Sequence, residues 1–238
     1  MSETSRKLRV FRLGRVDYKA VLDIQERLVR ARQLGLIEDT ILLLEHPNVY
    51  TMGRGARESF MIDPTIGPAV LRVSRGGEVT YHGPGQLVGY PILSLVGSER
   101  DVHDYLRGIE QSMIDALAGL GIAAGRRKGL TGVWIDDRKI ASIGVGIRRW
   151  VTFHGFALNV NTDLSFFDRI VPCGIAGCQM TSIAKEGLGE VTVDRVADHI
   201  AATFSKVFGR EAIVGEVDEL SVGCGDDWPE QVSALTLS

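Results

Sequence analysis

Apolar side chains recur every three or four residues in three stretches of the chain, the spacing that lines one face of an α-helix. The first stretch follows Asp17, the second begins near Asp101, and the third runs from about Thr192 to Phe208. Gly121 and Gly209 come directly after the second and third stretches, and glycine commonly ends a helix. The apolar positions are Val21, Ile24, Leu28 and Ala31, then Val102, Leu106, Ile109, Met113, Leu117 and Leu120, then Val193, Val196, Ile200, Phe204 and Val207. The pattern predicts three amphipathic helices.

Short runs of β-branched and aliphatic residues fill the intervals between these helices. Thr40–Glu45 is one run, and Trp150–Val160 is another. Val133–Ile135 and Lys139–Ile147 flank the polar turn formers Asp136-Asp137-Arg138, which predicts a β-hairpin. Long helices separated by clusters of strands predict an α+β fold rather than alternating βαβ units.

The chain shows no internal repeat and no linker that divides it. Its 238 residues, 45% of them hydrophobic, are enough to bury a sizeable core. We therefore expect one domain over residues 1–215. Residues 216–238 are expected to form a loosely ordered tail, because periodicity fades from Gly223 onward.

Charge and hydropathy exclude several classes of protein. The formal net charge is −3, so no global basic field favours nucleic acid. The longest aliphatic run, Ile41–Leu44, is far too short to cross a bilayer, and no apolar segment follows the basic start at residues 1–9 as in a secretory signal. Three cysteines do not make a disulfide framework. These features predict a cytoplasmic protein with reduced thiols that contacts no membrane.

The segment Arg75–Gln86 has the composition of a loop that cradles a ligand rather than of a buried strand. It combines four glycines and a proline with Arg75, Glu78, Tyr81 and His82. Glycine lets the backbone approach a ligand closely, and the polar side chains supply hydrogen-bond donors and a titratable ring. A surface turn rich in Gly and Pro has a similar composition, so composition alone leaves both interpretations open.

A possible nucleophile is Cys173, which lies between Pro172 and Gly174 and outside any periodic pattern. A free cysteine is more often a small buried hydrophobe than a nucleophile, and its thiol needs a nearby cation or base to react at neutral pH. Lys139, at the start of the second hairpin strand, is the candidate partner, although a lysine beside a turn is commonly just a solvated charge. Metal binding is not indicated, because Cys173 and Cys178 are five residues apart and no paired histidines follow.

Several motifs along the chain resemble one family. They are Arg75-Gly76-Gly77, Thr80-Tyr81-His82, Pro84-Gly85-Gln86 with Tyr90, Lys139-Ile140-Ala141-Ser142-Ile143-Gly144, Phe153-His154-Gly155-Phe156-Ala157-Leu158-Asn159, Pro172-Cys173-Gly174, and Leu44-Glu45-His46-Pro47 with Tyr50-Thr51 and Gly53-Arg54. In this order they resemble the lipoyl(octanoyl) transferases, and the resemblance covers roughly residues 10–210.

The resemblance implies a fold like the catalytic domain of biotin and lipoate protein ligases, with mixed sheets flanked by helices. It implies that Cys173 holds an octanoyl group as a thioester and that Lys139 activates the thiol. The walls of the acyl site are then Arg75, Gly76, Gly77, Glu78, Val79, Thr80, Tyr81, His82, Ser142, Ile143, Gly144, His154, Gly155, Phe156 and Ala157. A lone histidine more often orients a neighbour by hydrogen bonding than transfers protons, so His82 and His154 are expected to support the site.

The resemblance also implies the partners. The donor is octanoyl–acyl carrier protein, whose phosphopantetheine carries the acyl group, and the protein needs no cofactor or metal of its own. The acceptors are lysines on lipoyl domains of 2-oxoacid dehydrogenase E2 subunits and on the glycine-cleavage H protein, which starts protein lipoylation. The basic clusters Arg126-Arg127-Lys128 and Arg148-Arg149 are solvated faces or docking points for the acidic carrier.

Two other functions fit parts of the sequence. An ATP-dependent lipoate–protein ligase of the same fold shares an Arg-Gly-Gly loop and a downstream lysine, but it does not need Pro-Cys-Gly. A non-catalytic module that binds an acyl chain or a carrier protein would need neither Cys173 nor Lys139. A dinucleotide-binding enzyme and a serine hydrolase lack their fingerprints here.

Overall fold

The computed structural model describes residues 6–61, 67–175, 177–189 and 191–223. Its helices are α1 (Tyr18–Gln33), α2 (Val102–Gly119) and α3 (Val193–Val207). Its strands are β1 (Arg6–Arg15), β2 (Asp39–Glu45), β3 (Val49–Met52), β4 (Ala69–Arg72), β5 (Val79–His82), β6 (Gln86–Ile92), β7 (Gly125–Arg127), β8 (Leu130–Ile135), β9 (Arg138–Arg148), β10 (Val151–Asn159), β11 (Gln179–Met180) and β12 (Arg210–Val214).

All three helices lie where the periodicity predicts them. The side chains of Asp17, Asp101 and Thr192 accept hydrogen bonds from backbone N–H groups of the first turns of α1, α2 and α3. Gly121 and Gly209, directly past α2 and α3, have φ values of +84° and +61°. In this left-handed region glycine carries no steric penalty, so both helices end there.

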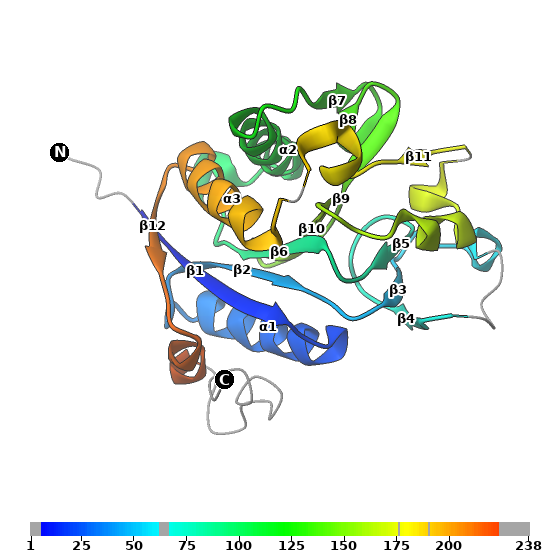
Figure 1. The fold of residues 1–238 in the computed structure, drawn as a ribbon. Helices are drawn as coiled ribbons and strands as arrows, with labels where there is room; N and C mark the ends of the chain where they lie inside the picture. Colours follow the sequence, from blue (N-terminus) through cyan, green and yellow to red (C-terminus); the bar gives the residue numbers. More distant parts are fainter. Residues whose placement is uncertain (1–5, 62–66, 176, 190, 224–238) are drawn as a thin grey trace.

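A large mixed sheet forms the centre of the molecule (Figure 1). Among the described residues its strand order is β12-β1-β2-β6-β10-β9-β8-β7, with β11 pairing with the start of β9. The β12–β1 and β1–β2 pairs are parallel, and from β2 to β7 each neighbouring pair is antiparallel. A smaller sheet of order β4-β3-β5 lies to one side. The α+β prediction is confirmed.

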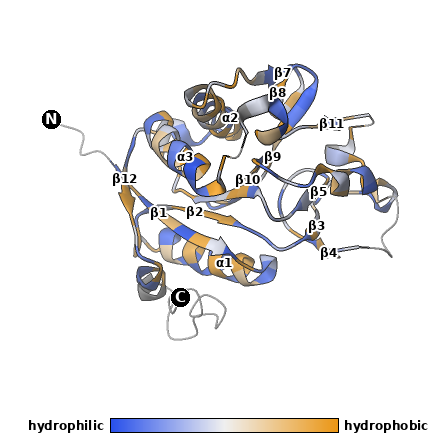
Figure 2. Ribbon diagram, in the orientation of Figure 1, coloured by the Kyte–Doolittle hydropathy of each residue, from blue (hydrophilic) through white to orange (hydrophobic). Residues whose placement is uncertain are grey.

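Helices cover both faces of the large sheet, so its central strands β2, β6 and β10 are buried on both sides. Along β2, Ile41 and Leu43 pack against the side of α2 and α3, whereas Leu42 and Leu44 pack against the side of α1. Figure 2 shows apolar residues concentrated along these central strands and on the helix faces turned toward them. A separate apolar cluster around Tyr50 holds the small sheet to the segments that follow β10.

The predicted hairpin is confirmed, because β8 and β9 are antiparallel neighbours joined at Asp136-Asp137. The prediction that Arg75–Gln86 is loop throughout is wrong. Val79–His82 forms the buried strand β5, and Gln86 begins β6 in the middle of the large sheet. Their buried polar side chains hydrogen-bond to one another, which made the segment look like a surface loop by composition.

Near both ends of the chain the structure is more regular than the sequence predicts. The polar start of the chain contains β1, whose Leu8 and Val10 face one apolar cluster and Phe11 and Leu13 the other. Of the expected tail, Val217–Gly223 forms a short 3₁₀-helix with Leu220 buried against the α1 side. Residues 224–238 lie outside the described residues. None of the described helices is long and apolar enough to cross a membrane.

Candidate active site

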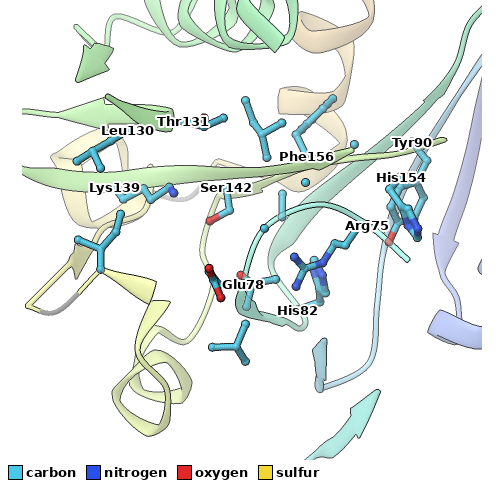
Figure 3. Close-up of a pocket in the computed structure, with 18 of the residues that line it drawn as sticks. Arg75, Glu78, His82, Tyr90, Leu130, Thr131, Lys139, Ser142, His154 and Phe156 are labelled. Carbon is cyan, nitrogen blue, oxygen red and sulfur yellow. The ribbon is translucent and has the colours of Figure 1, made fainter. Parts of the chain in front are cut away.

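A cavity of about 230 Å³ lies where the small sheet meets β9 and β10 of the large one. Figure 3 shows Lys139, Leu130 and Ser142 at one end, Tyr90 and His154 at the other, and Glu78 and Arg75 between them. The lining residues are Tyr18, Arg75, Gly77, Glu78, Val79, Thr80, His82, Tyr90, Gly129, Leu130, Thr131, Lys139, Ser142, Ile143, Gly144, His154, Gly155, Phe156, Ala157 and Ile175.

Lys139 is almost completely buried, with 2% of its surface exposed, even though it follows a turn. It is the second residue of β9, and its strand partner is Trp134 on β8. Its Nζ lies 5.3 Å from the centroid of the Trp134 ring, within cation–π range. A buried lysine at the wall of a cavity is not the solvated turn charge that its sequence position also allowed.

The predicted nucleophile Cys173 is placed by its backbone only, and its thiol lies outside the described residues. The backbone forms the short 3₁₀-helix Pro172–Gly174, which packs against β5. The next residue, Ile175, lines the cavity. A Cβ added to Gly174 would lie 3.1 Å from Cγ of Glu78, another lining residue. The turn that carries Cys173 therefore borders the cavity.

The loop that carries Arg75 is fastened to β9. The amide of Gly76 donates a 2.9 Å hydrogen bond to the carbonyl of Val145. At the contact point a Cβ on Gly144 would lie 2.8 Å from the Gly76 carbonyl oxygen and 3.0 Å from Cδ of Arg75. Glycine is required at position 144 because the two backbones approach too closely for any side chain.

A chain of buried hydrogen bonds behind the cavity has a fixed direction. The Asn159 amide donates to the Thr181 carbonyl, and the Gln86 amide donates to the Tyr81 carbonyl and to Oδ1 of Asn159. Oε1 of Gln86 therefore faces Nδ1 of His82 at 2.9 Å, and Nδ1 must carry the proton. Nε2 of His82 then accepts from the Thr51 hydroxyl at 3.3 Å.

A second series of buried hydrogen bonds involves His46, which is fully buried. Its Nδ1 lies 2.6 Å from the Val16 carbonyl, which can only accept, so Nδ1 donates. Nε2 accepts from the Tyr90 hydroxyl at 2.8 Å. Burial lowers the pKa of His46 to about 4 and raises the pKa values of Tyr90 and Tyr18. All three groups are neutral at pH 7.

His154 is held in an uncommon backbone conformation, with φ of +54°. Its amide donates to Oε1 of Gln25 at 2.7 Å, and its Nε2 lies 3.1 Å from the Ser74 hydroxyl. Burial, followed by the positive charge of Arg75, lowers the pKa of His154 to about 3. Burial also holds the pKa of His82 well below its usual value. Such weak bases favour the orienting role expected for these two histidines.

Three polar atoms of cavity-lining residues have no hydrogen-bond partner in the part of the chain that the structure describes. They are Oγ1 of Thr80, Oε2 of Glu78 and Nδ1 of His154, all removed from solvent. A buried hydroxyl without a partner is costly, so one is expected to come from a bound ligand or water. Thr80 can therefore donate to a carbonyl oxygen bound in the cavity.

Most of the predicted wall residues line the cavity, and two do not. Tyr81 points to the other face of β5, where its hydroxyl donates to Asn48 and its ring packs on Phe166. Gly76 contacts β9 instead. Prediction from the sequence assigned no role to the lining residues Tyr18, Tyr90, Ile175 and Gly129–Thr131. Tyr90 belongs to the motif Pro84-Gly85-Gln86 with Tyr90, so the sequence could have indicated it as a lining residue. The others, Tyr18, Ile175 and Gly129–Thr131, belong to no motif.

The two basic clusters lie in different places relative to the cavity. Arg126 is bound to Glu110 and Gln111, and Lys128 is exposed directly before the lining residues Gly129–Thr131. Arg148 is nine residues along β9 from Lys139, a span of about 30 Å in an extended strand. Among the described residues no group of three or more His, Cys, Asp and Glu side chains is arranged to hold a metal ion.

Comparisons with known proteins agree on one family. The lipoyl protein ligase A/B catalytic domain matches residues 17–205. An octanoyltransferase of Solibacter usitatus is 50% identical over 208 residues, covering 85% of this chain and 94% of that protein. One of Geobacter sulfurreducens is 48% identical over 198 residues, covering 83% of each.

The fold comparison identifies solved structures with the same fold. A putative lipoate protein ligase of T. acidophilum with bound lipoic acid aligns with a TM-score of 0.75 at 16% identity, covering 96% of this chain and 93% of that one. A biotin protein ligase of Aquifex aeolicus aligns with a TM-score of 0.50 at 14% identity, covering 84% and 70%. The predicted likeness to biotin and lipoate ligase catalytic domains is confirmed.

Proposed function

The chain belongs to the octanoyltransferases, within the lipoyl protein ligase A/B catalytic domain family, and from this membership we propose that it transfers an octanoyl group in lipoate biosynthesis. The donor is octanoyl–acyl carrier protein, and the acceptor is a lysine of a lipoyl domain, on 2-oxoacid dehydrogenase E2 subunits or the glycine-cleavage H protein. The reaction takes place in the cytoplasm and uses no cofactor of the protein's own.

The first step moves the acyl group onto Cys173. The amine of Lys139 takes the thiol proton, and the thiolate attacks the thioester carbonyl of the donor. The new C–S bond to Cys173 forms as the C–S bond to the carrier breaks, and Lys139 returns the proton to the departing carrier thiolate. A thioester replaces a thioester, so this step is nearly isoenergetic.

The second step releases the product. The acceptor lysine amine attacks the Cys173 thioester, Lys139 removes a proton from the attacking nitrogen, and the proton passes to the Cys173 thiolate as the C–S bond breaks. An amide replaces a thioester, which runs downhill without ATP. Splitting the transfer in two also means that the carrier and the lipoyl domain need not be bound together.

The cavity suits an acyl chain of limited length. Apolar side chains of Val79, Leu130, Ile143, Phe156 and Ala157 supply most of a hydrophobic wall. The volume of about 230 Å³ is below the ~300–1,000 Å³ typical of sites for drug-sized ligands. Thr80 supplies one hydroxyl to the acyl carbonyl, and donors of this kind contribute ~3–4 kcal/mol to transition-state stabilisation.

One observation carries the assignment of the chemistry. The amine of Lys139 is buried at one end of this cavity, and the turn bearing Cys173 borders the same cavity through Ile175. A buried amine that shares a cavity with a cysteine-bearing turn supports general-base activation of that cysteine.

The test is intact-protein mass spectrometry after brief incubation with octanoyl–acyl carrier protein. We expect one octanoyl adduct that hydroxylamine removes, that Cys173→Ser abolishes and that the matched control Cys178→Ser retains. Absence of an adduct, with transfer to a lipoyl domain only when ATP and free octanoate are added, would establish the ligase instead. Octanoyl binding with neither adduct nor transfer would identify a binding module.

A further inference from the structure

Gly132 on β8 leaves the space that the side chain of Lys139 occupies. A Cβ added to Gly132 would lie 2.6 Å from Cε and 3.2 Å from Nζ of Lys139. It would also lie 2.6 Å from the carbonyl oxygen of Ala141. Contacts below 3 Å force atoms to move, and the far end of the lysine stem is the part with most freedom to do so.

The backbone around this contact is irregular in a way that directs Lys139. Val133 pairs with Ala141, but the next pair is Trp134 with Lys139, so β9 carries one extra residue, Ile140. A β-bulge of this kind re-aims the neighbouring side chains. Gly132 itself has φ of +127°, which a residue with a side chain rarely adopts.

Helix α2 holds Gly132 in place through a buried carboxylate. Oε1 of Glu110 accepts a 3.0 Å hydrogen bond from the Gly132 amide. Oε2 of Glu110 accepts from Arg126 at 2.8 Å and from Arg107 at 2.5 Å, and the side chain is 1% exposed. The position of Gly132 is therefore fixed by a contact with the buried side of α2 as well as by its hairpin.

We propose that Gly132 is a positioning residue of the transfer reaction. Because Gly132 has no side chain, Lys139 can place its amine in the cavity. Glu110 on α2 holds the backbone of Gly132 in position. The proposal relies on the proposed function in taking Lys139 as the proton acceptor. The steric part, between Gly132 and Lys139, does not depend on any reaction.

The steric part is tested by a double-mutant cycle on thermal stability. Gly132→Ala should lower the melting temperature by several degrees, and Lys139→Ala should remove the part of that loss that comes from Cε and Nζ, while the part due to φ and to the Ala141 carbonyl remains. Gly121→Ala is the control for strain alone: φ there is +84° and nothing lies within 4 Å of an added Cβ. Its loss should be the same with or without Lys139. Equal losses for Gly132→Ala in both backgrounds would overturn the proposal.

If Gly132→Ala alone does not fold, the double-mutant cycle still tests the steric contact with Lys139. Folding recovered in the Gly132→Ala/Lys139→Ala double variant supports the steric contact with Lys139. Failure of the double variant as well means that the Ala141 carbonyl sets the limit, and that result contradicts the proposal.

The functional part is tested on folded Gly132→Ala by the rate of octanoyl adduct formation at saturating donor. We expect a fall of about 100-fold, the effect of a displacement of about 1 Å at a reacting group, with little change in the donor KM. The alkylation rate of Cys173, followed by peptide mass spectrometry, should also lose its wild-type pH profile. Wild-type rate and profile in Gly132→Ala would refute the positioning role. Absence of any adduct in the wild type would refute the proposed function and leave the steric result standing.

Discussion

Arg75 and Thr51 are joined by three buried hydrogen bonds. Nε and Nη2 of Arg75 donate to Oγ1 of Thr51 at 3.2 and 2.9 Å, and Nη2 also donates to the Thr51 carbonyl at 2.7 Å. Nη1 donates to the carbonyl of Gly76. Most of the guanidinium is thus directed at the protein itself. Arg75 borders the cavity, but its main effect is to hold the loop before β5 against β3.

Thr51→Val is expected to lower the free energy of unfolding by about 2–3 kcal/mol. Valine has the same shape but no hydroxyl, so two donated bonds of Arg75 and the donor to His82 are lost inside the protein. Chemical denaturation of the purified variant measures the loss. Octanoyl transfer should fall as well, because the Arg75 loop forms one wall of the cavity.

Thr51→Ser is the matched control for this prediction. Serine keeps the hydroxyl and removes only a methyl group, so its stability should stay much closer to wild type. A serine variant as unstable as the valine variant would show that packing of the methyl group, and not the hydrogen bonds to Arg75, accounts for the effect.

The buried histidines predict that stability falls on mild acidification. His46 has a pKa of about 4 in the folded protein against about 6.5 unfolded, so between these values the unfolded chain binds more protons. The contribution of the neutral His46 to the free energy of unfolding is complete above pH 6.5 and is lost as the pH falls toward 4. The loss from His46 amounts to about 3 kcal/mol. His154, with a pKa of about 3, acts in the same direction. Denaturant midpoints between pH 7 and pH 4 measure the slope.

A histidine titration by NMR separates this cause from general acid effects. The His46 ring should stay neutral down to about pH 4. A His46 ring that protonates near pH 6.5 in the folded protein would rule out the account.

The helices were predictable because each has one apolar face and a clear capping residue. The strands were less so. β5 and β6 are buried but carry Thr80, His82 and Gln86, whose polar groups are matched by partners distant in sequence, and a local pattern cannot reveal such partners. β1 alternates basic and apolar residues at the edge of a predicted polar terminus, so its place beside β2 was missed.

The site divides in the same way. Residues on contiguous motifs, such as Ser142–Gly144 on β9, were found because the motif itself resembles a known one. Tyr18 and Ile175 reach the cavity from α1 and from the turn after Cys173, and only the fold brings them there. The burial of Lys139 could not be predicted from the sequence either, because the neighbouring Asp136-Asp137-Arg138 indicates a solvent-exposed turn.

The length of the acyl chain that the cavity accepts should depend on Phe156, which lies both in the cavity wall and in the hydrophobic core. Its ring lines the cavity and is otherwise buried. Phe156→Leu should enlarge the cavity and raise the decanoyl-to-octanoyl ratio of kcat/KM by about tenfold, since a methylene or two in an apolar pocket is worth ~1–3 kcal/mol. Adduct formation with the two acyl carriers gives the ratio.

Phe153→Leu controls for loosened packing in the same strand. Phe153 is also buried in β10, but it packs on the α1 side and does not line the cavity. Its ratio should stay at the wild-type value. If both variants shift the ratio alike, chain length is set by the general rigidity of β10 and not by the wall at Phe156.

The carrier is expected to dock at the tip of the β7–β8 hairpin and not at the β9–β10 turn. Lys128 is exposed beside lining residues, whereas Arg149 lies beyond the far end of β9 from Lys139. Charge reversal of Lys128 to Glu should raise the KM for octanoyl–acyl carrier protein several-fold and weaken its dependence on salt, because a rim charge acts mainly on the association rate. Arg149→Glu, which makes the same change of net charge, should leave KM near wild type. The reverse ranking of these two variants would place the carrier at the β9–β10 turn, and equal effects would mean that only the overall charge of the protein matters.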